Sequence, residues 1–594
     1  MGIFCYNTPM KESLQKAISK ALESLGVEEA SFRIEYPENP EHGDFSCNAA
    51  MVYAKQLGMV PKILAEKIIG ELKKDLLEQI ASISVAGPGF INFKIKAAVF
   101  AEHVVSIVKK GAEYGWGSSN AGKKVLIEYT DPNIFKVFHI GHLMSNAIGE
   151  SLSRLIAGSG ADVTRLCYPS DIGLHIAKSV WAMQKHRGEI PSDDALIQAR
   201  TEFLGNMYVE GTQAYEADPA TKSDIDALNK ILYEKSNADV NALYDKGRKW
   251  SLEHFELLYK VLGTKFDAYI YESDMAPVGL EIVRAHVGKV FQESEGAIVF
   301  KGEEYGLPPS GDDSAHFVRG LHTRVFINSH GLPTYESKEI GLNTTKFKQY
   351  PDTSESIIVT ASEQNDYFKV VLKALSLIDA NVGSKTKHIG HGMLRFASGK
   401  MSSRTGKVIT AETLLEEIKA LVIEKIADRE LGLAEKEEIA GIVAIGAIKY
   451  TILRQAAGGD VIFDSTSSIS FEGDSGPYLQ YAAVRASAIL ARAQEQGIAM
   501  SGTITTLPES VSLVEKLISR FPDHVERARM EYAPQTIANY LITLAGAFNS
   551  YYASNQIIVE NDPLTPYRLD LTQAFLTTMT NGLWLLGIKV PKKM

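Results

Sequence analysis

The stretch Pro132-Asn-Ile-Phe-Lys-Val-Phe-His-Ile-Gly-His142 stands between a predicted buried strand and a predicted amphipathic helix. The strand is Lys124–Tyr129, an apolar run of the kind buried in parallel sheets. A second strand is predicted at 163–168. A strand, a helix and a strand within about 45 residues predict a βαβ unit. The sequence therefore favours a parallel sheet with a binding crevice at the carboxyl ends of its strands. The helix between the strands carries its apolar residues on one face: Leu143, Ala147, Ile148, Leu152 and Leu155.

Two histidines of this stretch, His139 and His142, are three residues apart at the start of the predicted helix. Residues at this spacing face the same side of a helix. The free N–H groups and the positive dipole end of a helix N-terminus favour a phosphate group, and Gly141 leaves room for a nucleotide near the backbone. Two imidazole N–H donors could hold a triphosphate there. The spacing also allows a helix cap with surface histidines, or two ligands of a metal, although no third Cys or His is placed to complete a zinc site.

The tetrapeptide His-Ile-Gly-His occurs again at 388–391. This copy lacks the preceding Pro-Asn and lysine, and the residues after it continue as a strand, so it has no helix N-terminus to bind phosphate. We expect His388 and His391 to have a structural or supporting role. The following loop, Ser398-Gly-Lys-Met-Ser-Ser-Arg-Thr-Gly-Lys407, is rich in hydroxyl groups and cations and could close over phosphates. A solvated basic loop is the alternative interpretation.

The rest of the chain divides around this α/β region. Residues 1–115 predict a small α+β domain, and a linker rich in Gly, Ser and Asn follows. Residues 120–412 form the α/β region, with a polar insertion at about 185–330. Residues 413–470 predict a helical connection, and residues 471–594 predict a helical domain.

The composition is that of a globular protein of several domains: 594 residues, 45% hydrophobic and 23% charged. No apolar run reaches the length of a membrane span, and the N-terminus has no secretory pattern. Three distant cysteines give no disulfide framework, so we expect a reducing, cytoplasmic location. The net charge of −10 disfavours binding of nucleic acid through the overall field. Any site for a polyanion must therefore be local.

Several strings, taken in order, resemble one family. A His-Ile-Gly-His element after the first strand and a Lys-Met-Ser element after the last are similar to those of class I aminoacyl-tRNA synthetases. Further strings resemble arginyl-tRNA synthetases, and together they span nearly the whole chain. They are His42-Gly-Asp-Phe45, Gly87-Pro-Gly-Phe-Ile-Asn-Phe93, Glu128-Tyr-Thr-Asp-Pro-Asn133, Gly331-Leu-Pro-Thr-Tyr335, Asp474-Ser-Gly-Pro-Tyr-Leu-Gln-Tyr481, Ala547-Phe-Asn-Ser-Tyr-Tyr552 and Leu586-Gly-Ile-Lys-Val-Pro-Lys-Lys-Met594.

The resemblance implies a Rossmann-like parallel-sheet catalytic domain, an α+β N-terminal domain and an all-α anticodon-binding domain. It implies an arginine–tRNA ligase. Such an enzyme activates L-arginine with ATP, accompanied by Mg²⁺, to arginyl-adenylate, and then transfers the arginyl group to the 3′ terminal ribose of tRNA(Arg). We expect a monomer that carries no metal site of its own and does not associate with membranes.

The roles of the family's residues transfer to matching positions. A guanidinium needs planar acceptors, ideally a carboxylate, and the residues implied for arginine are Glu128, Asn133, Tyr335, Glu339 and Gln364. Those implied for ATP are Lys136, His139, Gly141, His142, Lys400, Met401, Ser402 and Ser403. The catalytic residues among them are Lys136, His139, His142 and Lys400. Contacts with tRNA are implied for Asn92, Tyr551 and Tyr552.

Three features depart from the family pattern. One is the segment Glu336-Ser-Lys-Glu339, where Thr-Arg-Asp is commoner. Glu339 stands where Asp is usual, so the carboxylate must lie about one methylene further from the backbone. The loop reads Lys400-Met-Ser-Ser-Arg404, without the usual second lysine. In similar synthetases, a lysine shortly before the first histidine compensates for this loss, and Lys136 occupies that place.

Three other functions fit parts of the pattern. A class I synthetase for lysine, glutamine or cysteine shares the nucleotide motifs, but the missing zinc-type cysteines argue against cysteine, and Tyr335 with Glu339 favours a guanidinium. A small nucleotidyltransferase has no use for the additional domains at both ends. A non-catalytic tRNA-binding paralogue does not need Lys136, His139 and His142 intact.

Overall fold

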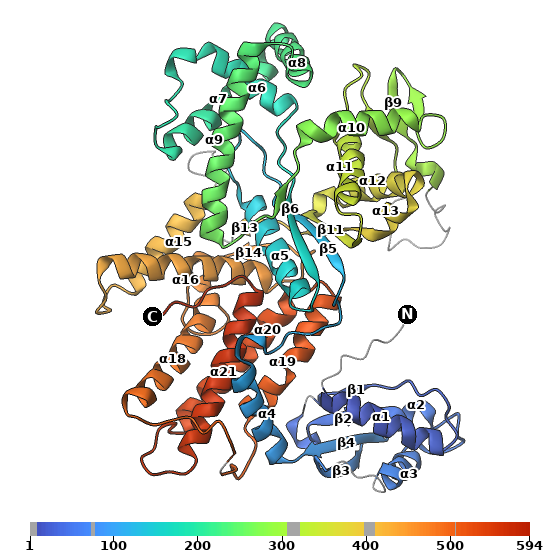
Figure 1. The fold of residues 1–594 in the computed structure, drawn as a ribbon, viewed down its shortest axis with the longest axis vertical. Helices are drawn as coiled ribbons and strands as arrows, with labels where there is room; N and C mark the ends of the chain where they lie inside the picture. The colour runs from blue at the N-terminus through green and yellow to red at the C-terminus, as the bar shows by residue number, and fades with distance from the viewer. Residues whose placement is uncertain (1–8, 38, 73–77, 306–320, 397–409, 505) are drawn as a thin grey trace. The chain divides into compact units, whose positions relative to one another are not determined.

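The computed structural model describes residues 9–37, 39–72, 78–305, 321–396, 410–504 and 506–594. They form two compact units, drawn together in Figure 1. One unit consists of residues 118–470 and 586–588, and it contains the predicted α/β region. The other combines both ends of the chain, since residues up to 117 cluster with 471–585 and 589–594.

The α/β unit is built on a sheet of five parallel strands in the order β12-β11-β5-β6-β7. In β5, Val125, Leu126 and Ile127 are buried, as expected for a strand that is covered on both faces. The predicted parallel sheet is confirmed. Its strands are β5 (Lys124–Tyr129), β6 (Asp162–Cys167), β7 (Ala268–Tyr269), β11 (Thr353–Ala361) and β12 (Thr386–His391).

The strand order creates a topological switch point beside β5. Helix α5 (Ile140–Ala157) connects β5 to β6 on one side, whereas β11 pairs with β5 on the other. The helix lies directly on the sheet at Gly149, where an added Cβ atom would stand 2.2 Å from the Tyr129 ring. The carboxyl ends of β5 and β11 therefore border the crevice in which sheets of this type bind ligands.

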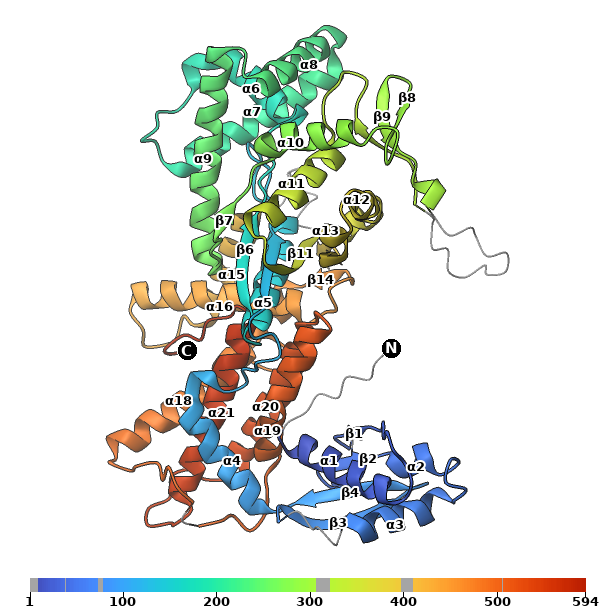
Figure 2. The ribbon, with the colours of Figure 1, turned by 45° about the vertical axis from the view of Figure 1, so that its right-hand side comes forward.

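Four helices follow β6 before the sheet resumes: α6 (Leu174–Lys185), α7 (Ile197–Ala217), α8 (Pro219–Glu234) and α9 (Ala238–Leu262). Figure 2 shows these helices gathered at one end of the α/β unit, with α9 running back along it. Strand β7 and helix α10 (Glu272–Ala285) then return the chain to the sheet. The segment 185–330, predicted as one insertion, thus contains a strand of the central sheet.

The second part of the α/β unit surrounds the other side of the crevice. A small antiparallel sheet of β8 (Gln292–Ser294), β9 (Ala297–Phe300) and β10 (Arg324–Ile327) precedes helices α11 (Tyr335–Gln349), α12 (Asn365–Ile378) and α13 (Ala380–Lys385). The aromatic side chains Phe291, Phe300 and Phe326 pack together beneath them. The unit ends with α15 (Ala411–Lys425), α16 (Leu433–Leu453), α17 (Ser465–Ser468) and the parallel pair β13 (Leu394–Phe396) and β14 (Val461–Phe463).

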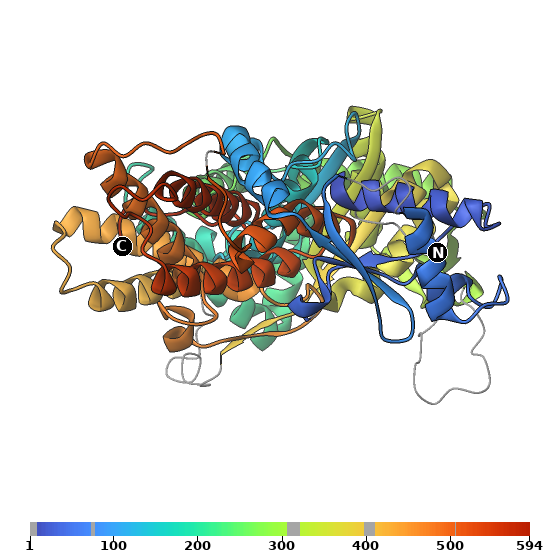
Figure 3. The same cartoon turned by 90° about the horizontal axis from the view of Figure 1, so that it is seen from below.

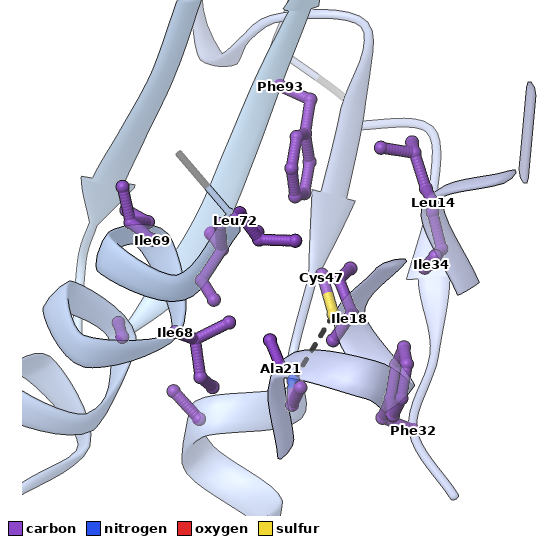
Figure 4. Close-up of a cluster of buried hydrophobic side chains, with 14 of the residues drawn as sticks. Leu14, Ile18, Ala21, Phe32, Ile34, Cys47, Ile68, Ile69, Leu72 and Phe93 are labelled. Atoms are coloured by element: carbon purple, nitrogen blue, oxygen red, sulfur yellow. Dashed lines mark hydrogen bonds between the residues drawn. The ribbon is translucent and has the colours of Figure 1, made fainter. Parts of the chain in front are cut away.

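The N-terminal region is the predicted α+β domain. Its antiparallel sheet has the order β1-β2-β4-β3, and its helices supply apolar side chains that meet those of the sheet. Figure 4 shows Ile18, Ile68 and Phe93 in this core. The elements are α1 (Pro9–Ser24), β1 (Ile34–Glu35), β2 (Phe45–Cys47), α2 (Ala49–Tyr53), α3 (Pro61–Leu72), β3 (Ile80–Ala86) and β4 (Phe90–Ile95).

The C-terminal region is all-α, as predicted, and α4 (Ala97–Lys110) from the N-terminal half joins it. Figure 3 shows these helices from below, with α4 beside the orange and red helices. Two ion pairs link the N-terminal domain to α19 within this unit: Lys11 with Asp523 at 2.9 Å and Lys516 with Asp44 at 2.7 Å. The other helices are α18 (Gly476–Glu495), α19 (Leu513–Met530), α20 (Gln535–Ser554) and α21 (Thr565–Leu585).

Candidate active site

A cavity of about 500 Å³ lies at the switch point, at the carboxyl ends of β5 and β11. Its lining comes from β5 and the loop after it, from the first turns of α5 and α11, and from the turn η6 (Ser362–Gln364). Segments far apart in the sequence thus meet where the sheet topology predicts a ligand. Eight residues singled out from the sequence line this cavity: Glu128, Asn133, His139, Gly141, His142, Tyr335, Glu339 and Gln364.

The loop from β5 to α5 has a strained backbone. Three non-glycine residues adopt left-handed conformations, Thr130 (φ 80°), Asp131 (φ 42°) and Phe135 (φ 67°). Such conformations cost about 1–3 kcal/mol each and persist where the surroundings fix them. Here the Thr130 N–H donates to Ser145 Oγ at 2.9 Å, and the Phe135 N–H donates to Ser251 Oγ at 3.0 Å. The strained loop carries Asp131 and Asn133 to the cavity wall.

The two histidines of the first His-Ile-Gly-His cap helix α5. The Gly141 N–H donates to His139 Nδ1 at 3.1 Å, and the His139 N–H donates to His142 Nδ1 at 3.3 Å. Burial, together with the charge of Lys136, lowers the pKa of both imidazoles. Neutral rings that accept at Nδ1 must carry their proton on Nε2. The capping pattern therefore leaves each ring one Nε2–H donor for a ligand.

The second His-Ile-Gly-His lies in strand β12, where the sequence predicts a strand. His388 Nε2 lies 2.8 Å from Thr360 Oγ1, and the His388 ring stacks on Phe368. His391 is buried at the edge of the cavity, and its Nδ1 lies 2.8 Å from the Gly392 carbonyl oxygen. His388 thus supports the sheet, whereas His391 lines the site.

Two buried ion pairs form part of the cavity wall. The carboxylate of Glu128 pairs with Lys346, which is fully buried on helix α11. The carboxylate of Glu272 pairs with Lys338 at 2.5 Å, also with both side chains buried. The charge of each carboxylate is therefore already compensated, and Glu128 faces the cavity as half of an ion pair rather than as a free anion.

Two further carboxylates, Asp131 and Glu339, line the same cavity without an ion-pair partner among the described residues. The Tyr168 N–H donates to Asp131 Oδ1 at 2.7 Å, and Asn343 Nδ2 donates to Glu339 Oε2 at 3.2 Å. Burial and the nearby charge of Glu128 raise the pKa of both groups, that of Glu339 to about 8. A cavity lined by two carboxylates that lack a cation, one of them buried, is suited to a cationic ligand.

The remaining residues that were predicted to bind the arginine substrate also line the cavity. Tyr335 starts helix α11 and is 52% exposed, one turn before the buried Glu339. Gln364 is exposed at the end of η6, and Asn133 lies within the strained loop. Tyr335 and Glu339 both lie on α11, and their spacing of four residues places them on one face of that helix. Tyr335 and Gln364 thus lie at the open side of the cavity, and Glu339 lies at its buried side.

Of the lysines that were predicted to bind ATP, only Lys136 lies in the described part of the chain. Lys136 is close enough to lower the pKa of His139 and His142, but it does not line the cavity, and its Nζ lies 4.7 Å from the centre of the Tyr208 ring. The predicted residues Lys400, Met401, Ser402 and Ser403 lie outside the described part of the chain.

The three residues that were predicted to contact tRNA belong to the unit formed by the two ends of the chain. Asn92 is buried in β4, and its Oδ1 accepts from Ser46 Oγ at 2.7 Å. On helix α20, Tyr552 is 42% exposed and lies under Arg485, whereas Tyr551 is partly buried. Tyr552 is therefore the most accessible of the three.

Sequence reasoning did not assign several residues of the site. It named Asp131 only within a turn and a family string, and it did not assign Glu272, Lys338 or Lys346. A signal for the two lysines was present, because Lys338, Glu339 and Lys346 are charged residues on one predicted helix. Among the described residues, no group of three His, Cys, Asp or Glu side chains could hold a metal, and no helix could cross a membrane.

Known families match this chain in three consecutive segments. Residues 10–95 match the arginyl tRNA synthetase N terminal domain, residues 103–465 match the catalytic domain of class I (R) tRNA synthetases, and residues 479–594 match the DALR anticodon binding domain. The catalytic match contains every residue that lines the cavity.

Whole proteins match over nearly their full length. The arginine–tRNA ligase of Clostridium botulinum is 31% identical over 96% of this chain and 97% of its own length. That of Halothermothrix orenii is 31% identical over 98% and 99%. The structure of Thermus thermophilus arginyl-tRNA synthetase aligns with a TM-score of 0.77 at 23% identity, covering 98% of this chain and 100% of its own.

Proposed function

The chain belongs to the class I arginyl-tRNA synthetases, and we propose from this premise how its residues carry out the reaction of that family. The enzyme uses ATP to activate L-arginine as arginyl-adenylate, with release of pyrophosphate. It then transfers the arginyl group to the 3′ terminal ribose of tRNA(Arg), with release of AMP. The observation that carries the assignment of residues is the pairing, in one cavity, of two imidazole donors with two carboxylates that lack a cation.

The first step needs no protein base. The carboxylate of arginine is already ionised, so it can attack the α-phosphate in line, and pyrophosphate leaves. What the protein supplies is position and stabilisation of charge. In this proposal the Nε2–H groups of His139 and His142 donate to phosphate oxygens, and Gly141 leaves space for the nucleotide. Mg²⁺ accompanies ATP as part of the substrate.

The arginine side chain enters the acidic part of the cavity. Glu339 receives the guanidinium, because a carboxylate can accept two parallel N–H bonds from it. Tyr335 borders the same pocket one helical turn away. Glu128 acts through its ion pair with Lys346, which holds β5 and α11 together beneath the ligand. This differs from a direct contact between Glu128 and arginine.

The amino and carboxyl ends of arginine lie toward the open side. Asn133 and Gln364 hold these ends, and Asp131 supplies the negative charge for the α-ammonium group. Asp131 suits this role because, like Glu339, it lines the cavity without an ion-pair partner among the described residues, and it sits at the end of β5 beside Asn133. Two ligand cations thus meet two protein anions.

The phosphate chain of ATP receives its cations from Lys136 and Lys400. Met401, Ser402 and Ser403 complete the loop that covers the nucleotide. Lys136 stands in for the second lysine that this loop lacks. Contacts with tRNA come from Tyr552 in the helical region, with Tyr551 and Asn92 as further contacts. The enzyme works as a cytoplasmic monomer.

Charging of total tRNA with each of the twenty amino acids, one labelled amino acid per reaction, tests the function. Arginine alone should yield acid-precipitable label, and the yield should depend on ATP. The His142→Ala variant serves as the control for contaminating synthetases, because it should lose charging while keeping its fold. Charging with lysine or glutamine at a comparable rate would contradict the assignment.

A further inference from the structure

The side chain of Lys136 is held by an aromatic ring rather than by a carboxylate. Its Nζ lies 4.7 Å from the centre of the Tyr208 ring, on helix α7 of the helical insertion. Among the described residues, Lys136 forms no ion pair within 4.0 Å. An aromatic face attracts an ammonium group without neutralising its charge. The lysine is therefore kept in place while its full charge remains available to an anion.

The insertion contacts the chain on both sides of this lysine. On α9, Ser251 accepts from the Phe135 N–H, and Gly247 stands so close to the Phe135 ring that an added Cβ would lie 2.2 Å from it. On α7, a Cβ added to Gly205 would contact Val137 at 3.6 Å. The segment 135–137 is thus packed against both helices, directly before His139.

We propose that Tyr208 is a positioning residue, which holds the ammonium group of Lys136 in reach of the phosphate chain of ATP. This inference rests on the role proposed above for Lys136. The helical insertion then contributes to the reaction, because Tyr208 on α7 positions Lys136. Lys136 in turn replaces the second lysine that the segment Lys400–Arg404 lacks. Tyr208 acts through Lys136 and needs no contact with the substrate.

The test compares substitutions on α7 by steady-state charging, with ATP and arginine varied separately. Tyr208→Leu removes the aromatic face and should lower kcat/KM for ATP by about 2- to 30-fold, the range of a cation–π contact. The KM for arginine should stay within about twofold. Tyr208→Phe keeps the face and should behave as the parent enzyme. The matched control is Tyr215→Leu, which removes another ring of α7 from beside Lys178 and Lys222 and should leave the kinetics unchanged.

A double-mutant cycle with Lys136→Met separates this inference from the proposed function. If Lys136 contacts the phosphates and Tyr208 acts through it, Lys136→Met lowers kcat/KM for ATP and Tyr208→Leu adds nothing further. Equal effects of Tyr208→Leu in both backgrounds would overturn the inference while leaving the role of Lys136 intact. A Lys136→Met variant with parental kinetics would overturn both. An increase in the arginine KM for Tyr208→Leu would overturn it too, because Tyr208 would then act on the arginine pocket rather than through Lys136.

Discussion

Replacing Glu339 with Gln should weaken arginine binding by an amount that depends on pH. The carboxylate is 8% exposed and has no cationic partner among the described residues, so it meets the guanidinium in a desolvated site. Removing one partner of a buried ion pair costs about 3–5 kcal/mol. In the free enzyme, burial and the charge of Glu128 raise the pKa of Glu339 to about 8. At pH 7, binding must therefore first remove a proton, at a cost of about 1.4 kcal/mol.

The cost of losing the ion pair, minus the cost of removing the proton from Glu339, gives the expected loss of arginine affinity in Glu339→Gln. At pH 7 the net loss is about 1.6–3.6 kcal/mol, which corresponds to a Kd for arginine that is about 15- to 400-fold weaker. At pH 8.5 the proton is mostly gone, so the loss should be about eightfold larger. The sign follows from linkage: the free site holds a proton that the complex releases, so the parental Kd falls as pH rises toward 8 and then levels off. Glutamine does not titrate, so its Kd should lack this dependence.

Isothermal titration calorimetry of arginine at pH 7 and pH 8.5 measures both quantities. Buffers of different ionisation enthalpy report the released proton directly. Glu363→Gln makes the same change at an exposed position of the cavity wall and should alter Kd by less than about threefold. Glu339→Asp should bind arginine more tightly than Glu339→Gln. Parental affinity of Glu339→Gln at both pH values would refute the reasoning, and the guanidinium would then be read by Asp131 or Glu128.

Three further predictions concern the histidines, the buried ion pair and the tRNA surface. His139→Ala and His142→Ala should each lower charging by about 10²–10³ with unchanged folding, since each removes a preorganised donor, whereas His388→Ala should mainly lower Tm. Lys346→Met should lower the free energy of unfolding in urea by about 3–5 kcal/mol, and adding Glu128→Gln should restore much of it, because no charge is then left buried alone. Tyr552→Ala should weaken tRNA binding by about 1–3 kcal/mol, the size of one base stacked on a ring. The salt dependence should be shallow, because residues 471–594 carry 10 basic against 11 acidic side chains.

Distinct results would contradict each of these predictions. Dispensable His139 and His142, with an essential His388, would assign the nucleotide to the other tetrapeptide. A Lys346→Met variant as stable as its double mutant with Glu128→Gln would mean that the pair carries no buried charge. A steep salt slope that disappears with the C-terminal segment would indicate a basic patch that the composition hides.

The sequence predicts the sheet and the histidine pair well, because both depend on local patterns. The apolar run of β5 and the helix after it are short-range signals, and His139 and His142 are only three residues apart. The N-cap position of His139 was foreseeable from the same stretch. The tautomer was not, because it depends on which backbone N–H each Nδ1 accepts.

The charge pattern of the cavity could not be predicted in the same way. The ion pair of Glu128 with Lys346 joins residues that are more than two hundred positions apart, so no local sequence pattern predicts it. Without that partner, Glu128 and Glu339 look equally suited to a guanidinium. The structure distinguishes them, because Glu128 is already paired with a lysine and Glu339 has no cationic partner among the described residues. Asp131 was overlooked for a similar reason, since Asp before Pro is also typical of a turn.

The ratio of kcat/KM for arginine to that for lysine, measured as tRNA-dependent formation of AMP from ATP, tests the central claim most directly. A pocket that binds a guanidinium through a buried carboxylate leaves that carboxylate badly paired when lysine binds. Sites of this kind can reject an analogue by roughly 10⁴ or more, so the account predicts a ratio of at least that size. A ratio near one, or AMP formation driven better by any other amino acid, would contradict it.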